Sequence, residues 1–152
     1  ATAVTQNCCA TTRCTRGSRR YNSVNSQVRR EIEMAYVDGF LIPVPRRNRD
    51  KYRRMSIQAG KVWMDHGALK YHECVADDVK FGRITSFPKG VKLKKGEEVW
   101  FSWIVYKSRK DRDRVNKLAM KDPRLAHMMD LKAMPFDGKR MVFGGFKMLV
   151  DL

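Results

Sequence analysis

The side chains in this sequence that are best suited to chemistry are one histidine and a few acids. His66 stands between Asp65 and Gly67. We expect it at the C-terminal end of a helix, where the helix dipole favours a cationic imidazole and Asp65 could orient the ring. Glu73 and Asp38 lie in two segments rich in β-forming residues. A histidine beside carboxylates can transfer protons, so the candidate catalytic residues are His66, Glu73 and Asp38.

Each candidate also has a purely structural explanation. His66 could simply cap or pack the end of its helix, and acids in a chain this basic could serve mainly in ion pairs. Alternatively, the acids could gather near a strand end and bind a metal or act as a base. Such a cluster would consist of Glu73, Asp38, Asp77 and Asp78. The three histidines lack the spacing of metal ligands, so we predict no metal site and no cofactor.

Basic side chains suggest that the ligand is an anion. Runs of Lys and Arg occupy 92–95 and 107–114, and arginine binds carboxylates and phosphates through two parallel hydrogen bonds. The same runs suit an RNA backbone equally well, and a solvated surface would also explain them. The candidate ligand-binding residues are Tyr71, Asp77, Asp78, Lys107, Arg109 and Arg140.

Length and composition limit the protein class. The 152 residues include 32 Lys or Arg and 16 Asp or Glu, for a formal net charge of +16, and 43% are hydrophobic. These values are typical of one globular domain with a true core. No apolar run approaches the ~20 residues that a membrane helix needs, and four cysteines do not make a disulfide framework. We therefore predict a cytoplasmic protein with no membrane partner.

The first 33 residues differ in kind from the rest. They contain six arginines, no lysine and three of the four cysteines, and they show no apolar period. Residues 30–33 can be encoded by a purine-rich ribosome-binding sequence just before Met34. We therefore interpret 1–33 as a disordered tail translated from an upstream leader. A transit peptide is the alternative, although the tail lacks the apolar face of such helices.

From residue 34 onward, strand and helix patterns alternate. Strands are predicted at 36–44, 69–75, 98–107 and 139–150, with Gly144-Gly145 marking a bulge or a close backbone approach. One helix should follow Asn48 and end at Gly67, and a second should begin at Ser108. The loop 79–96, with a short element at 83–87, is long enough to act as a lid or binding loop. The order βαββαβ predicts an α+β, ferredoxin-like fold: a four-stranded antiparallel sheet with two helices on one face.

Both faces of the predicted sheet are apolar. In 99–106 one alternating set of side chains contains Trp100 and Ile104, while the other contains Phe101 and Trp103. Two helices can cover only one face, so the other needs a partner. A second copy of the chain is the simplest cover, giving a homodimer through the helix-free face. RNA stacked on the aromatic residues is the alternative, although Glu97 and Glu98 at the start of this strand do not suit it.

Cys74 should be a small buried residue.

Seven short motifs are spread over residues 34–152: YVDGF (36–40), HGAL (66–69), ECVADD (73–78), TSFP (85–88), FSWIVYKS (101–108), KDPRL (121–125) and MPFDGKRM (134–141). Through these motifs the chain resembles the YbaA-like family of uncharacterised bacterial proteins. The resemblance implies a dimeric α+β barrel, in which two ferredoxin-like sheets pack face to face. That superfamily includes cofactor-free monooxygenases, stress proteins and haem-degrading enzymes, so the fold alone assigns no activity.

The sequence therefore predicts a homodimer that binds a small anionic ligand between the sheet, the first helix and the 79–96 loop. The same pocket could also support a reaction, which would make the protein an enzyme. An RNA-binding module with a basic surface is the alternative, and a purely structural or regulatory dimer is the third.

Overall fold

The computed structural model describes residues 35–128 and 134–152, except for the side chain of His127. The predicted tail, 1–33, lies outside this range. The sheet consists of β1 (Tyr36–Pro45), β2 (Lys70–Val75), β3 (Glu97–Tyr106) and β4 (Val142–Lys147). The α-helices are α2 (Arg49–Asp65), α3 (Phe87–Gly90) and α4 (Arg109–Ala119), and the 3₁₀ helices are η1 (Arg46–Asn48), η2 (Pro123–Met128) and η3 (Gly138–Arg140). No helix among the described residues is long and apolar enough to cross a membrane.

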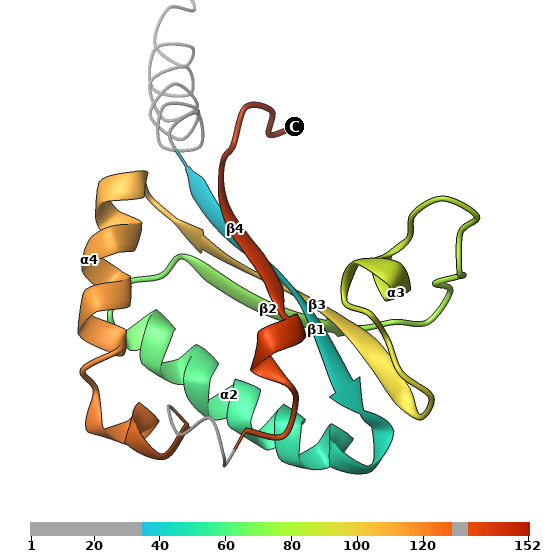
Figure 1. Ribbon diagram of the computed structural model, residues 1–152. Coiled ribbons are helices and arrows are strands. Elements are labelled where there is room, and N and C mark those ends of the chain that lie inside the picture. Colours follow the sequence, from blue (N-terminus) through green and yellow to red (C-terminus); the bar gives the residue numbers. More distant parts are fainter. Residues whose placement is uncertain (1–34, 129–133) are drawn as a thin grey trace, which may run out of the picture.

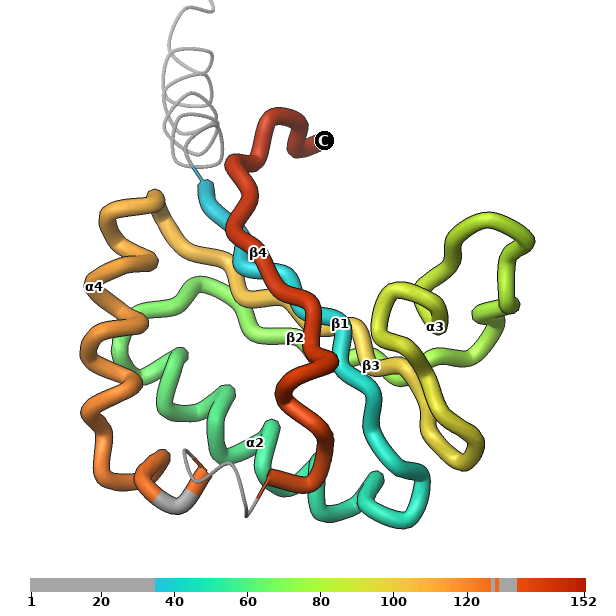
Figure 2. The backbone as a smooth tube through the Cα atoms, in the orientation of Figure 1, coloured from blue at the N-terminus to red at the C-terminus, as the bar shows by residue number. Residues whose placement is uncertain are grey.

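The strands form one antiparallel sheet in the order β2-β3-β1-β4. Helices α2 and α4 cover one face of it, while α3 lies apart from them (Figures 1 and 2). This arrangement confirms the predicted ferredoxin-like α+β fold. Strands β1 and β3 are central because each pairs with a neighbouring strand on both sides. Both strands are rich in β-branched and aromatic residues.

The core lies between the sheet and the two long helices. Near the start of α2, Tyr52 packs edge-on against Trp100, next to Ile42 and Val44 of β1. Towards α4, buried side chains from the sheet and both helices form a second cluster, whose fully buried members are Ala68, Ile104, Tyr106 and Val115. The space between the two clusters is not filled, and it contains the candidate site.

The helix ends mostly follow the sequence. Gly67 ends α2 with a positive φ of +109°, as predicted for a C-terminal glycine. The hydroxyl of Ser108 accepts a hydrogen bond from the Asp111 backbone N–H and so caps α4. Asn48 precedes α2 but does not cap it with its side chain, because its amide donates to the Pro135 carbonyl at 2.7 Å.

Three local predictions differ from the structure. The last strand is shorter than 139–150, because 138–140 form a 3₁₀ turn that is tied down by ion pairs of Arg140. The short element expected at 83–87 is α3, which begins at Phe87 behind a Ser86 cap. Cys74 is exposed rather than buried, since it points to the helix-free face of an edge strand. The second of the two alternatives predicted for Gly144-Gly145 is found: β4 keeps a regular register, and a Cβ at Gly145 would lie 2.5 Å from the Tyr36 hydroxyl.

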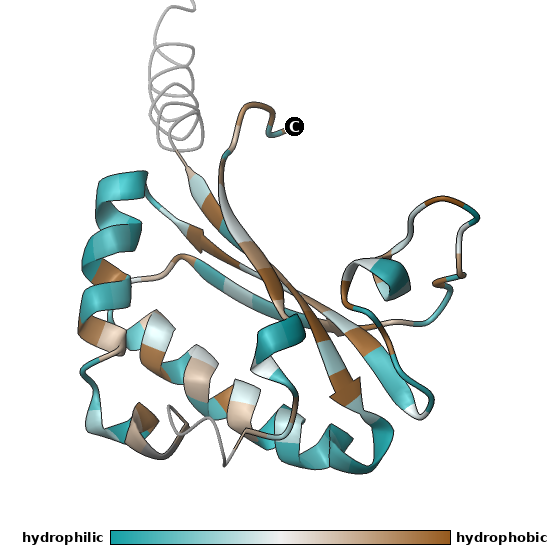
Figure 3. Cartoon of the chain, in the orientation of Figure 1, coloured by the Kyte–Doolittle hydropathy of each residue, from teal (hydrophilic) through white to brown (hydrophobic). Residues whose placement is uncertain are grey.

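The helix-free face of the sheet is apolar and largely uncovered in one subunit. Phe101 is 45% exposed and Phe146 62% exposed, and Phe87 from α3 covers part of Phe101. Figure 3 shows hydrophobic segments along the strands and in the loop that carries α3. Because an exposed apolar face of this kind usually contacts a partner, the homodimer stays a prediction.

Gly67 offers a test of the connection between α2 and β2. Replacing Gly67 by Ala places a side chain at φ +109° and within 2.9 Å of the Arg114 guanidinium. We expect a loss of about 1–2 kcal/mol in the free energy of unfolding, measured by urea denaturation. Gly90→Ala is the matched control, because a Cβ there meets nothing within 4 Å. Equal stability of the two variants would contradict this account.

Candidate functional site

A cavity of about 490 Å³ lies between the sheet, α2 and α4, and it is partly open to solvent. Most of its lining is apolar and comes from the sheet, both helices and the segment that leads to η3. The main apolar lining residues are Phe40, Met55, Trp63, Ile104, Phe136 and Phe143. Polar side chains gather at two places, one around Glu73 and one around Asp38. None of the cavity residues belongs to the loop 79–96, which packs with Phe87 against the other face of the sheet.

Glu73 on β2 is held by two tyrosines. The Tyr52 hydroxyl donates to Glu73 Oε2 at 3.0 Å, and the Tyr71 hydroxyl donates to Oε1 at 2.8 Å. Ser56, one turn after Tyr52 on α2, is buried beside them, but its hydroxyl makes no hydrogen bond of good geometry. Gly60 follows one turn later, and its missing side chain gives the Tyr71 ring its place, since a Cβ would lie 2.8 Å from it.

Burial controls the proton affinity of this group. Removal from water raises the pKa of the Glu73 carboxyl, against the opposing effect of the hydrogen bonds from Tyr71 and Tyr52 and of the nearby Ser56 hydroxyl. Burial likewise raises the pKa of both tyrosines far above the ordinary range, so they are neutral donors. A carboxyl group with a raised pKa next to an apolar cavity can act as a general acid or base, or can anchor a hydrogen-bond donor.

Asp38 on β1 has a different environment. Arg112 Nε lies 3.0 Å from Asp38 Oδ1, and the Asn116 amide donates to Oδ2 at 3.1 Å. Asn116 accepts from the Trp63 indole at 2.8 Å and from the Tyr106 hydroxyl at 2.9 Å, which fixes its orientation. A cation therefore compensates the charge of Asp38, although the Arg112 Nε–H makes no hydrogen bond of good geometry.

The Glu73 group also borders a second depression. A groove of about 670 Å³ on the outer side of α2 shares Ser56, Tyr71 and Glu73 with the inner cavity. Arg53 and Lys61 of α2 line this groove. These three shared residues thus form the wall between a basic outer groove and an apolar inner cavity.

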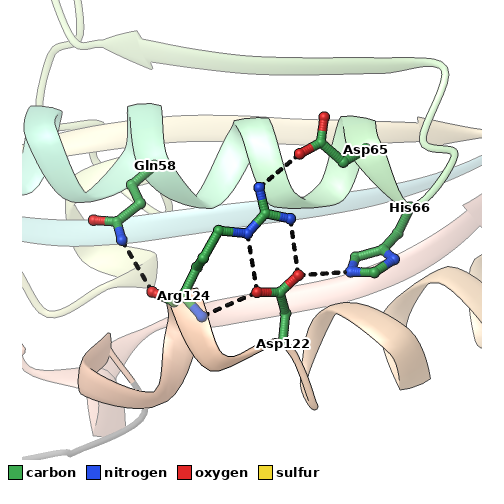
Figure 4. A network of polar contacts seen from close by, with 5 residues as sticks. All are labelled: Gln58, Asp65, His66, Asp122 and Arg124. Atoms are coloured by element: carbon green, nitrogen blue, oxygen red, sulfur yellow. Dashed lines mark hydrogen bonds and ion pairs between the residues drawn. The ribbon is translucent and has the colours of Figure 1, made fainter.

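His66 lies apart from both depressions. Its Nε2 is 2.9 Å from Asp122 Oδ2, and Asp122 also binds Arg124, as Figure 4 shows. Arg124, followed by His66, holds the pKa of Asp122 well below its usual range. Asp65, the predicted partner of His66, instead accepts from Arg124 at 2.7 Å. The network ties the end of α2 to η2, which is the structural role weighed for His66 from the sequence.

The remaining predicted residues do not assemble at one place. Tyr71 joins Glu73 at the cavity, but Asp77 and Asp78 are exposed beyond β2, and Lys107 and Arg109 lie on the surface near the start of α4. Among the described residues, no group of three or more His, Cys, Asp or Glu could hold a metal. Arg140 pairs with Glu97 and Asp137, at 2.6 and 2.9 Å, and holds η3 against β3.

Sequence reasoning missed five polar residues of the cavity: Tyr52, Ser56, Ser102, Arg112 and Asn116. The spacing of Tyr52 indicates only the apolar face of a helix, and Arg112 belongs to a basic run. The available signal is the partly buried strand face shared by Tyr71 and Glu73, since two polar side chains on the covered face of a strand need partners from the covering helix.

The fold and the cavity define a ferredoxin-like α+β protein with polar groups at an interlayer cavity. Residues 35–138 match the model of a family described as protein of unknown function (DUF1428). The chain is 46% identical over 118 residues to the uncharacterized protein YbaA of Escherichia coli K12, and it matches YbaA of Shigella flexneri equally well. These alignments cover 78% of this chain and 99% of each relative. The chain belongs to this YbaA-like family, as its motifs predicted.

The raised pKa of Glu73 predicts a specific pH dependence of stability. A carboxyl with a raised folded-state pKa stabilises the protein most below the unfolded pKa, and this contribution is lost as the pH rises through the folded pKa. In Glu73→Gln, the free energy of unfolding should therefore increase relative to the unsubstituted protein as the pH rises from 4 to 8. Within the window between the two pKa values, the slope should approach about 1.4 kcal/mol per pH unit.

Urea denaturation at several pH values measures this difference. Glu97→Gln is the control, because Arg140 lowers the pKa of Glu97, so its contribution changes only below the unfolded pKa of about 4.3 and its difference from the unsubstituted protein should stay level as the pH rises further. A constant difference between Glu73→Gln and the unsubstituted protein across the pH range would contradict the assigned environment of Glu73.

Proposed function

We propose that this protein binds a small, largely apolar molecule in the inner cavity, with Glu73 as its polar anchor. The observation that carries the proposal is an apolar cavity of about 490 Å³ with a hydrogen-bonding group of incomplete partners at one end. Small-molecule sites typically combine this volume with an apolar lining and a few convergent polar groups. Glu73, poised by burial to gain or lose a proton, would also serve as the acid or base of a reaction there.

The lining argues for a ligand other than the anion expected from the net charge. Arg112 is the cavity's one strong cation within the described residues, and Asp38 already occupies it. Glu73 would repel an anion in its ionised form. The unpaired Arg and Lys side chains lie outside, so the charge of the chain describes its surface rather than this cavity.

Binding of 2-phenylethanol tests the proposal, since it joins an apolar ring to one hydroxyl. We expect saturable binding with a Kd on the order of 1 mM, as usual for so small a ligand. In ¹H–¹⁵N NMR spectra, the largest shifts should include the Trp63 indole N–H and the backbone of Ala59, both at the cavity. Ala59→Phe should weaken binding at least fivefold by filling the space, whereas Lys51→Phe on the exposed side of α2 should not.

Either of two results would refute the proposal. One is the absence of saturable binding, and the other is shifts confined to residues outside the cavity. The NMR map needs only the unsubstituted protein, so it decides the matter even if Ala59→Phe does not fold.

The second part of the proposal is that the helix-free face pairs with the same face of a second copy. Support comes from the exposed Phe101, Val142 and Phe146 on that face, an apolar surface that an isologous contact would bury. The protein should then sediment at twice its chain mass of 17.7 kDa. Phe101→Glu should shift it to monomer, whereas Ile57→Glu, an equally exposed site on the outer side of α2, should not. A monomer at micromolar concentration would refute the dimer.

A further inference from the structure

Glu73 differs from the other acids that are withdrawn from solvent. Asp38 pairs with Arg112, Glu98 with Arg49, Glu97 with Arg140 and Asp122 with His66 and Arg124. For Glu73, the described residues supply only neutral hydroxyls, and no basic group there lowers the pKa of this carboxyl. A partly buried carboxylate without a cation is costly, although the chain has 32 Lys and Arg residues that could supply one.

The geometry around Glu73 leaves more acceptors than donors unused. Tyr52 and Tyr71 each use their one O–H donor on the carboxylate, so their oxygens keep lone pairs. The Ser56 hydroxyl is 95% buried, makes no hydrogen bond of good geometry and can both donate and accept. A group that donates several hydrogen bonds and carries positive charge would therefore complete this cluster.

The basic side chains nearby cannot easily fill this role. Arg112 is held by Asp38 and lies over the Tyr36 ring, at 5.1 Å from its centroid. Arg49 is engaged by Glu98 through two hydrogen bonds. Arg53 and Lys61 line the outer groove, on the side of Glu73 that faces away from the inner cavity. On the inner side, Ser102 of β3 lies directly across from Glu73 in the sheet, and the rest of the nearby lining is mostly apolar, as at Met55 and Ala59.

We propose that the ligand of the inner cavity is a primary amine on an apolar body, bound with its ammonium group at Glu73, Ser56 and the two tyrosine oxygens. This inference rests on the proposed function of the cavity and specifies its ligand class. An ammonium group presents one positive charge and three donors, enough for the carboxylate and two of the three hydroxyl oxygens at a time. A metal ion would need more charged ligands than this cluster has.

Three probes of nearly equal shape test the inference: 2-phenylethylamine, 2-phenylethanol and 3-phenylpropanoate, each titrated at pH 7.5. We expect the amine to bind at least about tenfold more tightly than the alcohol, and the carboxylate most weakly. Glu73→Gln should reduce the affinity for the amine about tenfold and change that for the alcohol less than twofold. Asp77→Asn, an exposed acid just beyond β2, should change neither.

The pH dependence gives an independent readout. The groups that face Glu73 are Tyr52 and Ser56 from α2, Ser102 from β3 and Tyr71 from its own strand. Arg49, Arg53, Lys61 and Asp65 line the outer groove beside it. Affinity for the amine should rise with pH as Glu73 releases its proton, while affinity for the alcohol stays level.

The outcomes separate this inference from the proposed function. If the amine and the alcohol bind equally in the cavity, the amine inference is wrong and the binding function stands. If none of the three probes binds, the binding function itself is wrong. Amine binding that survives Glu73→Gln unchanged would also overturn the inference. Ser56→Ala, which removes one acceptor, should reduce the affinity for the amine about threefold. It serves as a second variant if Glu73→Gln does not fold.

Discussion

The contact between α2 and the edge strand β2 depends on a carboxylate that two tyrosines bind from opposite sides. Tyr52 comes from the helix and Tyr71 from the strand, and both hydroxyls end on Glu73. Each hydrogen bond to a charged acceptor stabilises the fold by more than a neutral one, yet the buried charge opposes it. Gly60 lets the Tyr71 ring lie directly against the helix, so the backbone of α2 and the position of Glu73 are set together.

This arrangement explains why an open space persists inside a small domain. Large apolar side chains close the interlayer at both ends, around Tyr52 and around Tyr106. Between them, the Glu73 and Asp38 groups require room for their hydrogen-bond partners, and apolar side chains cannot close over them without leaving polar atoms unpaired. Methionines such as Met55 and Met141 line the space, and their flexible side chains can adapt to an occupant.

The sequence was informative where local chemistry decides the structure. Runs of β-forming residues located β1 and β3, and Gly67 located the end of α2, because these depend on neighbours in the chain. Strand alternation placed Tyr71 and Glu73 on one face, which is half of the candidate site. The sequence alone could not identify Tyr52 as their partner, because its distance from Glu73 depends on how the whole helix lies on the sheet. The contact of His66 with Asp122, 56 residues away, is set in the same way.

The net charge of the chain does not predict the charge of its cavity. Net charge is a sum over the chain and is dominated by exposed Lys and Arg, whereas a cavity responds to the few groups that line it. Here those groups are two carboxylates with unequal partners. Arg112 compensates Asp38 permanently, so that end of the cavity serves as scaffold. Glu73 has hydroxyls alone, so its charge state depends on protons and on whatever enters the cavity. Chemistry in this fold is therefore expected at the end of the cavity whose charge the protein leaves uncompensated.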